Sequence, residues 1–241
     1  RKPRVKQLFK VPQHLPACVD LQKSCDTFLD FEGRSNRKHA RLLQNFSSMD
    51  SVTICTHLQF DPKDFGFSAI FSYSTPSYLN EFQLRANLTR GKHVQLALLV
   101  HGVHGPYLKA FDHDDLWHSV CVSWSHNEGR WALHTDGVLI AKGEGLNATD
   151  SFGPGGLFII GQEQDTYGGS FKADESFSGS ITELHIWNRV LNSSEIAIME
   201  KKCSPPSLGL FLCLHCYVEK QSHRDHSKAF FDCILELQAK I

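Results

Sequence analysis

The chain has 241 residues, which is enough for one large β-sandwich or two small domains with a substantial buried core. Hydrophobic residues make up 41% and charged residues 21%, so the sequence is typical of a globular protein rather than a disordered one. A net charge of −1 gives no overall reason to expect nucleic acid or an anionic membrane as a partner. No apolar run reaches the roughly 18 residues that a membrane-spanning helix needs, so we expect no membrane span within this chain.

Residues 1–26 form a basic, proline-containing segment ahead of the first β-rich run. Five of the first ten residues are lysine or arginine. Clustered like charges at a chain end are usually solvated. We therefore interpret this segment as an extended leader and place the start of the folded domain at residue 27.

Short apolar runs separated by turn signals follow residue 27, and this pattern predicts an all-β sandwich. The run 51–60 alternates between apolar and polar residues as a half-buried strand does. Further strands are predicted at 69–73, 94–100, 118–124, 130–135, 138–141, 157–160 and 181–187. The Asp136-Gly137 pair supplies the positive φ angles of a two-residue turn, so it predicts a hairpin between the strands on either side of it.

One helix is predicted after the last of these strands. Asn192 suits the N-cap position and Glu195 the third helical position, which together form a capping box. The Ser-Pro-Pro-Ser sequence after Cys203 ends the helix, because proline disrupts helical hydrogen bonding.

The loop after strand 157–160 is rich in oxygen ligands. Residues 161–165 are Gly-Gln-Glu-Gln-Asp, and two more carboxylates, Asp174 and Glu175, follow in the same loop. Calcium takes six to eight oxygen ligands from carboxylates, amides and backbone carbonyls, so this composition suits a calcium site. A solvated acidic loop without an ion fits the composition equally well.

Cysteines and glycosylation sequons indicate the secretory pathway. The chain has eight cysteines, an even number that favours disulfides in an oxidising compartment. Four Asn-x-Ser/Thr sequons accompany them, at Asn45, Asn87, Asn147 and Asn192. We therefore expect an extracellular or cell-surface glycoprotein.

No sequence motif indicates catalysis. Gly-x-Ser-x-Gly, His-Glu-x-x-His and phosphate-binding loop motifs are all absent from the sequence. No pairing of a nucleophile with a base can be proposed, so we expect a protein that is not an enzyme.

Six motifs together resemble the pentraxin family. In chain order they are Ile-Cys-Thr-His-Leu at 54–58, Ile-Phe-Ser-Tyr-Ser-Thr at 70–75, His-Ser-Val-Cys-Val-Ser-Trp at 118–124, Asp-Gly at 136–137, Gly-Gln-Glu-Gln-Asp-Thr-Tyr-Gly-Gly-Ser-Phe at 161–171 and Ile-Trp-Asn-Arg-Val-Leu at 186–191. The resemblance extends from about residue 27 to residue 200. It implies a two-sheet antiparallel jelly-roll sandwich, with one short helix on one face and a ligand site holding two calcium ions on the other.

The resemblance also implies roles for particular residues. The family's disulfide falls on Cys55 and Cys121. Its calcium ligands fall on Asn80, Glu163, the carbonyl of Gln164, Asp165 and Glu175.

Two of the family's acidic ligands are missing. Leu79 stands where an aspartate usually precedes Asn80, and Lys172 stands at another acidic position. These changes remove two negative charges and add a positive one, and calcium affinity depends on the charge of the ligands. We therefore expect one calcium ion, with the second weakened most, and Asp174 as a candidate replacement ligand.

Arg85 occupies the position of an aromatic residue that contacts phosphocholine in the family's acute-phase members. We therefore do not predict phosphocholine binding. The ligand is left open as a protein, a glycan or an anionic small molecule that touches Arg85 or Lys172.

The segment 208–241 departs from the family pattern, and we expect it to form an atypical tail after a domain that spans 27–207. Residues 228–240 predict a short amphipathic helix in this tail. Such a tail puts completion of the sandwich edge in question, and with it ring assembly, so a homo-oligomer is open. The pairing of the other six cysteines is also open; they are Cys18, Cys25, Cys203, Cys213, Cys216 and Cys233.

The sequence thus predicts a non-enzymatic, calcium-influenced recognition module outside the cell. Pentraxin domains occur in secreted pattern-recognition proteins and in adhesion G-protein-coupled receptors, and the altered calcium set and extra cysteines favour the receptor module. The alternatives are a secreted pattern-recognition protein and a structural spacer without a small ligand.

Overall fold

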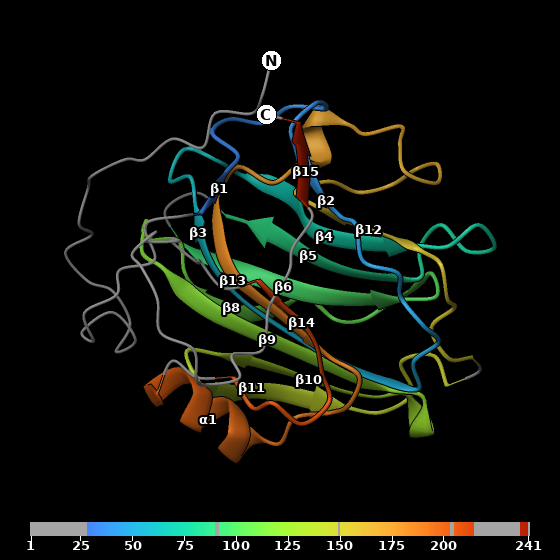
Figure 1. Cartoon of the computed structure of the whole chain (residues 1–241). Helices are drawn as coiled ribbons and strands as arrows, with labels where there is room; N and C mark the ends of the chain where they lie inside the picture. Colours follow the sequence, from blue (N-terminus) through green and yellow to red (C-terminus); the bar gives the residue numbers. More distant parts are fainter. Residues whose placement is uncertain (1–27, 90–91, 149, 203–204, 215–236, 241) are drawn as a thin grey trace, which may run out of the picture.

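The computed structural model describes residues 28–89, 92–148, 150–202, 205–214 and 237–240. Two antiparallel sheets pack against each other, and helix α1 (Ser193–Lys202) lies on the outside of one of them (Figure 1). The predicted fold class, an all-β two-sheet antiparallel sandwich with one short helix on one face, is confirmed. The predicted leader, 1–26, lies outside the described residues.

The first sheet has seven strands in the order β1-β13-β3-β9-β10-β11, with β14 paired to β13. Their bounds are β1 (Leu29–Asp30), β3 (Ser51–Phe60), β9 (His118–Ser125), β10 (Arg130–Thr135), β11 (Val138–Gly143), β13 (Gly179–Trp187) and β14 (Leu210–Leu214). All neighbouring strands are antiparallel. Strand β13, which comes late in the chain, therefore lies between two of the earliest strands.

The second sheet has eight strands in the order β15-β2-β12-β4-β5-β6-β7, with β8 paired to β6. Their bounds are β2 (His39–Leu42), β4 (Gly66–Ser74), β5 (Phe82–Leu88), β6 (His93–Val100), β7 (Val103–His104), β8 (Leu108–Asp112), β12 (Leu157–Ile160) and β15 (Leu237–Lys240). Among the described residues, two short 3-10 helices, η2 (Asn127–Gly129) and η3 (Ala173–Glu175), lie in connecting loops.

The core between the sheets is rich in aromatic side chains. Trp124 is fully buried and packs against Phe152 with ring centroids 4.6 Å apart. Phe71 and Phe158, from neighbouring strands β4 and β12, stack at 5.1 Å. Burial of such rings contributes much of the stability of a core.

All the strands predicted from the sequence are present, but several others were missed. The omitted elements include β2, β5 and β8, and β5 is the most important because it carries part of the candidate site. The predicted hairpin is also present: Thr135 pairs with Val138, and Asp136 and Gly137 have φ angles of 50° and 74°. The turn therefore has the geometry that the Asp-Gly pair predicted.

Helix α1 begins with the predicted capping box. The Asn192 side-chain oxygen accepts a hydrogen bond from the Glu195 amide at 3.0 Å, and the Glu195 carboxylate accepts one from the Asn192 amide at 2.9 Å. Arg189 adds an ion pair to Glu195 at 2.7 Å. These contacts fix the start of the helix.

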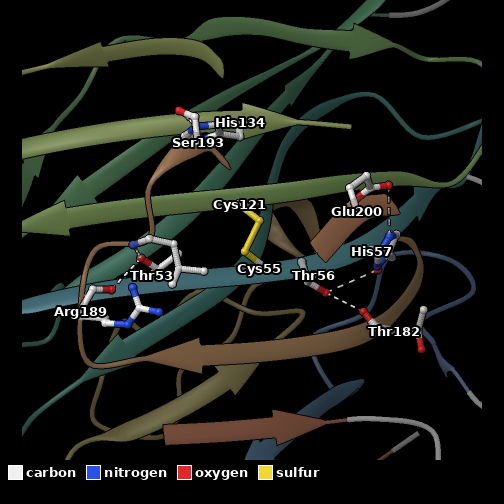
Figure 2. The surroundings of a disulfide bond; sticks show 11 residues. Thr53, Cys55, Thr56, His57, Cys121, His134, Thr182, Arg189, Ser193 and Glu200 are labelled. Atoms are coloured by element: carbon white, nitrogen blue, oxygen red, sulfur yellow. Dashed lines mark hydrogen bonds and ion pairs between the residues drawn. A yellow bond between two sulfur atoms is a disulfide. The ribbon is translucent and has the colours of Figure 1, made fainter. Parts of the chain in front are cut away.

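The predicted disulfide joins Cys55 and Cys121, which are direct cross-strand partners on β3 and β9 (Figure 2). Both residues are buried beneath α1 in a small cluster with Trp187, Leu191 and Ile196. The disulfide therefore stabilises the layer between the first sheet and the helix.

The C-terminal segment differs from the expectation that it leaves the sandwich. Strand β14 pairs with β13, and β15 pairs with β2, so both described pieces of the segment extend the sheets. The backbone of an edge strand offers unpaired N–H and C=O groups, which explains why such segments add to it. The amphipathic helix predicted at 228–240 is wrong at 237–240, which form β15, and residues 228–236 lie outside the described residues.

Of the six cysteines without a predicted pairing, Cys213 lies in β14 and the other five lie outside the described residues. Within the ranges that the structure describes, no helix is long and apolar enough to cross a membrane.

Candidate functional site

A pocket of about 470 Å³ opens on the outer face of the second sheet. It is lined by Phe67, Ser68, Ala69, Arg85, His104, Tyr107, Glu163 and Glu175. These residues come from β4, β5, β7, the segment between β7 and β8, and the acidic loop. The pocket therefore lies where the predicted calcium loop meets the sheet.

Strand β5 delivers Arg85 to the pocket by simple alternation. Its apolar residues Phe82, Leu84, Ala86 and Leu88 all belong to the core between the sheets. Successive side chains of a strand point to opposite faces, so Arg85 points outward.

The pocket has an aromatic wall. The rings of Phe67 and Tyr107 lie 6.0 Å apart, and His104 lies 5.1 Å from Tyr107. Phe67 is 57% exposed, which is unusual for a large apolar side chain that has packing partners nearby. Burial raises the pKa of Tyr107, so its hydroxyl is neutral and able to donate a hydrogen bond at physiological pH.

Arg85 and Glu163 form an ion pair on the floor of the pocket. The Arg85 Nε also donates to the Gln83 side-chain oxygen at 2.8 Å, which fixes the guanidinium. Glu163 is only 11% exposed. Burial, followed by the hydrogen bond with Glu175, raises the pKa of Glu163 to about 7. Both carboxylates line the pocket.

Lys172 neutralises the outer part of the acidic loop. Its ammonium nitrogen lies 3.0 Å from the Asp165 carboxylate and 3.8 Å from that of Glu175. The hydrogen bond to Asp165 raises the pKa of Lys172, so the ammonium is fully charged at physiological pH.

The amide side chains of the loop have structural roles. Gln164 is 1% exposed; its nitrogen donates to the Ser72 carbonyl and the Leu157 carbonyl at 3.1 Å, and its oxygen accepts from the Gly168 amide at 3.0 Å. The Asn80 side-chain oxygen accepts from Gln83 at 2.5 Å. The side chains of Gln164 and Asn80 are thus already engaged in hydrogen bonds.

Protein cations face two of the carboxylates that are predicted to bind calcium. In the described part of the chain, no three His, Cys, Asp or Glu side chains are placed to hold a metal ion. Glu163 and Asp165 each face a protein cation, Arg85 and Lys172 respectively. Glu163 and Glu175 line the same pocket, and Lys172 contacts both Asp165 and Glu175. Asn80 lies between β4 and β5. The calcium ion stays a prediction.

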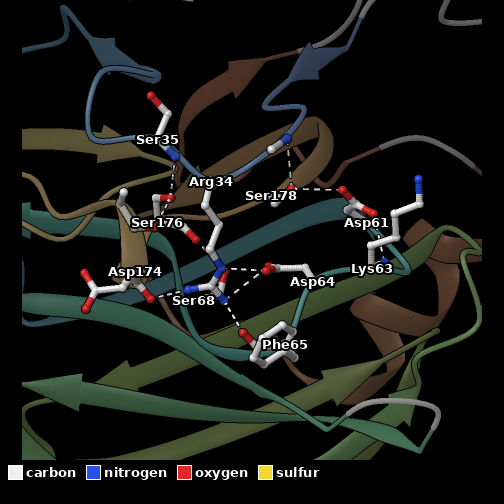
Figure 3. Close-up of polar contacts among 12 residues, drawn as sticks. Arg34, Ser35, Asp61, Lys63, Asp64, Phe65, Ser68, Asp174, Ser176 and Ser178 are labelled. Carbon is white, nitrogen blue, oxygen red and sulfur yellow. Dashed lines mark hydrogen bonds and ion pairs between the residues drawn. The ribbon is translucent and has the colours of Figure 1, made fainter.

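Arg34 holds the acidic loop in position (Figure 3). Its Nε lies 2.5 Å from the buried Asp64 carboxylate, and its guanidinium also donates to the carbonyls of Phe65 and Asp174. Asp174, the candidate replacement ligand, is therefore fixed through its backbone next to Glu175. Arg34 is a positioning residue for the carboxylate side of the pocket.

The four predicted glycosylation sites lie in different environments. Asn45 and Asn192 are exposed, and Asn87 and Asn147 are half-buried. Asn192 combines its sequon with the N-cap of α1, where only its oxygen is used. That glycans are attached at these four asparagines stays a prediction.

Sequence reasoning missed the aromatic wall. Phe67, His104 and Tyr107 lie far from the acidic loop in sequence, and no spacing rule connects them to it. The available signal was the alternation of β5, which places Arg85 outward and implies an outward partner on β4.

The structure is an antiparallel β-sandwich domain with an open pocket on the outer face of its second sheet. A family model described as the Pentaxin family matches residues 27–210, more than half of the chain. The chain belongs to the Pentaxin family, so the predicted resemblance is confirmed.

Two curated relatives show the range of the match. Adhesion G protein-coupled receptor D2 of Homo sapiens is 39% identical over 182 residues, which cover 76% of this chain and 19% of the receptor. Neuronal pentraxin receptor of Homo sapiens is 33% identical over 176 residues, covering 73% of this chain and 34% of that protein. The chain thus spans a minor part of the length of both relatives.

Solved structures agree with the fold. A heptameric SAP-like pentraxin from Limulus polyphemus has a TM-score of 0.67 at 27% identity, covering 73% of this chain and 82% of that one. The extracellular region of zebrafish Gpr126/Adgrg6 has a TM-score of 0.60 at 14% identity, covering 78% and 24%, and shows the fold alone. The jelly-roll fold and the extracellular or cell-surface location predicted from the sequence are confirmed.

Proposed function

We propose that this chain is a non-enzymatic ligand-recognition module in the extracellular part of an adhesion-type receptor. The match to an adhesion receptor at 39% identity supports the receptor context. The pocket of about 470 Å³ supports recognition of a ligand, because its size lies in the usual range of small-molecule sites.

The chemistry of the pocket favours a glycan as the ligand. Phe67 offers an exposed aromatic face and the half-buried ring of Tyr107 lies beside it, and aromatic faces pack against the apolar faces of sugar rings. Arg85, Glu163 and Glu175 offer donors and acceptors for hydroxyl groups. A free anionic small molecule is less well suited, because two carboxylates face the pocket and Arg85 is already paired with Glu163. The aromatic wall above a charged floor is the observation that carries this proposal.

The proposed recognition does not require calcium. Arg85 and Lys172 supply fixed positive charges to the carboxylates that would otherwise face an ion. The one calcium ion expected from the resemblance is the competing prediction. Calorimetric titration with calcium chloride separates the two, since heat of binding at submillimolar calcium would support the ion.

Glycan-array binding of the purified chain, repeated in calcium and in EDTA, tests the proposal. We expect binding to a defined set of glycans in both buffers. Phe67→Ala and Arg85→Ala should each weaken that binding about tenfold or more, because they remove the wall and the floor of a desolvated site.

Phe65→Ala is the matched control, because Phe65 is also an exposed phenylalanine, 55% accessible, but does not line the pocket. Its binding should equal that of the unmodified chain. The proposal fails if no glycan binds, or if Phe65→Ala weakens binding as much as Phe67→Ala does.

The alternatives predicted from the sequence make different forecasts. A structural spacer would bind no glycan, and the Phe67→Ala substitution would leave its free energy of unfolding unchanged. A secreted recognition protein would bind ligand as a ring, as the heptameric Limulus pentraxin assembles. Light scattering of the purified chain distinguishes a monomer from such a ring.

A further inference from the structure

Asn87 stands beside the aromatic wall of the pocket. It lies two residues after Arg85 on β5, so both side chains point to the same outer face. In the strand register, Asn87 pairs with Phe67 of β4 and with Gln95 of β6. Directly opposed residues on one face have Cβ atoms about 4.5–5.5 Å apart. Asn87 is therefore an immediate neighbour of Phe67, an exposed residue of the wall.

Asn87 also has the properties of a usable glycosylation acceptor. The sequence Asn87-Leu-Thr89 is a complete sequon. Asn87 lies one residue before the end of β5, next to a turn in which the Lys92 amide donates to the Thr89 carbonyl. Its side-chain nitrogen donates one hydrogen bond, to Gln95 at 3.3 Å, and a glycosylated amide keeps one N–H for it.

The other sequons have no such relation to the pocket. Asn192 caps α1, which lies on the first sheet, and none of Asn45, Asn147 or Asn192 lines the pocket or pairs with a strand residue that does. Asn87 is thus distinguished by its place in the register of β4, β5 and β6.

We propose that an N-linked glycan on Asn87 packs against Phe67 and restricts access to the pocket. The first sugar would place its apolar face on the exposed ring, in the same way as the proposed ligand. Glycan occupancy at Asn87 would then set how much of the protein is competent to bind. This role in binding rests on the proposed function, whereas the placement of the glycan does not.

Hydroxyl-radical footprinting of the chain secreted from animal cells tests the placement without any ligand. Peptide mass spectrometry first measures the occupancy of Asn87. The rates at which radicals oxidise Phe67 and Tyr107 are then compared among three chains: the original sequence, Thr89→Ala and Thr89→Ser. Thr89→Ala removes the sequon but keeps Asn87, whereas Thr89→Ser retains the sequon. Asn45→Gln removes a different glycan and is the control.

We expect Thr89→Ala to raise the modification of Phe67 and Tyr107 severalfold, with Phe65 unchanged. Thr89→Ser and Asn45→Gln should behave like the unmodified chain. The inference would be overturned if Asn87 carries no glycan, or if Phe67 is oxidised at the same rate with and without the sequon. If the chain binds no glycan on the array but the sequon still protects Phe67 and Tyr107 from oxidation, the proposed ligand is rejected and the placement of the Asn87 glycan stands.

Discussion

Lys172 controls the charge of the acidic loop, because its ammonium group contacts both Asp165 and Glu175. Lys172→Glu replaces that cation with a carboxylate beside two others, which is the oxygen-rich environment that calcium prefers. We expect this variant to gain a calcium-dependent rise in melting temperature that the unmodified chain lacks, because an ion that binds only the folded state stabilises it. Differential scanning calorimetry in calcium and in EDTA measures the difference.

Lys142→Glu is the control for this variant, because it makes the same charge change at an exposed position on β11, in the other sheet. It should show no calcium response. A calcium-dependent rise of similar size in the unmodified chain would show instead that Lys172 does not exclude the ion.

His118 makes stability depend on pH. Burial alone would lower the pKa of His118, but the hydrogen bonds to Asp136 at 2.8 Å and Asp114 at 3.2 Å outweigh it and raise the pKa above its ordinary value. A histidine with a raised folded-state pKa contributes its full stabilisation below the unfolded pKa, about 6.5. That contribution is lost as pH rises through the folded-state pKa.

We therefore expect His118→Gln to lower the free energy of unfolding by about 1 kcal/mol at pH 5.5 and by less at pH 8.5. Urea denaturation at the two pH values measures this. His93→Gln, on β6, makes the same substitution in the other sheet and is the control. An equal loss at both pH values for His118→Gln would contradict the explanation.

At the level of elements, the Asn192 side chain is one half of the capping box that starts α1. Asn192→Ala should lower the free energy of unfolding by about 1 kcal/mol, because the Glu195 amide loses its acceptor. Asn192→Asp restores an acceptor and should recover most of that loss. Both variants remove the sequon, so a loss that is equal in the two would point to the glycan rather than the cap. Thermal unfolding by circular dichroism measures both.

Strand β5 shows what the sequence allowed and what was missed. Phe82, Leu84, Ala86 and Leu88 alternate with Gln83, Arg85 and Asn87, which is a clear period of two. The strand was predictable on that ground. The register of β5 against β4 was not, because the bulge between Ala69 and Phe71 shifts the pairing and no local signal announces it.

The candidate site was predictable only in part. The acidic loop and Lys172 could be named, because Glu163 and Asp165 lie in the motif at 161–171 and Lys172 follows it directly. The ion pairs and the aromatic wall depend on contacts between residues distant in sequence, such as Arg85 with Glu163. Those contacts follow from the sheet register, which the sequence pattern does not determine.

At the scale of the whole molecule, the Cys55–Cys121 disulfide closes a loop with a sequence separation of 66. In the chain-entropy account, a loop of that size contributes about 4 kcal/mol to stability. We expect the double variant Cys55→Ala, Cys121→Ala to lose about that amount in guanidinium denaturation. Reducing the disulfide of the original chain should lower the free energy of unfolding by a similar amount. If only the double variant is destabilised, the loss comes from a packing defect and not from the missing disulfide.

The place of β13 between β1 and β3 has a consequence for biosynthesis. While the chain emerges from the ribosome, β3, β9, β10 and β11 can pair as soon as they appear, but β1 has no partner until β13 has been made. Until then β3 remains an open edge that can pair with another nascent chain. A secretory chaperone would therefore be needed most between the synthesis of β11 and that of β13, and a chain ended in that interval would be prone to aggregation.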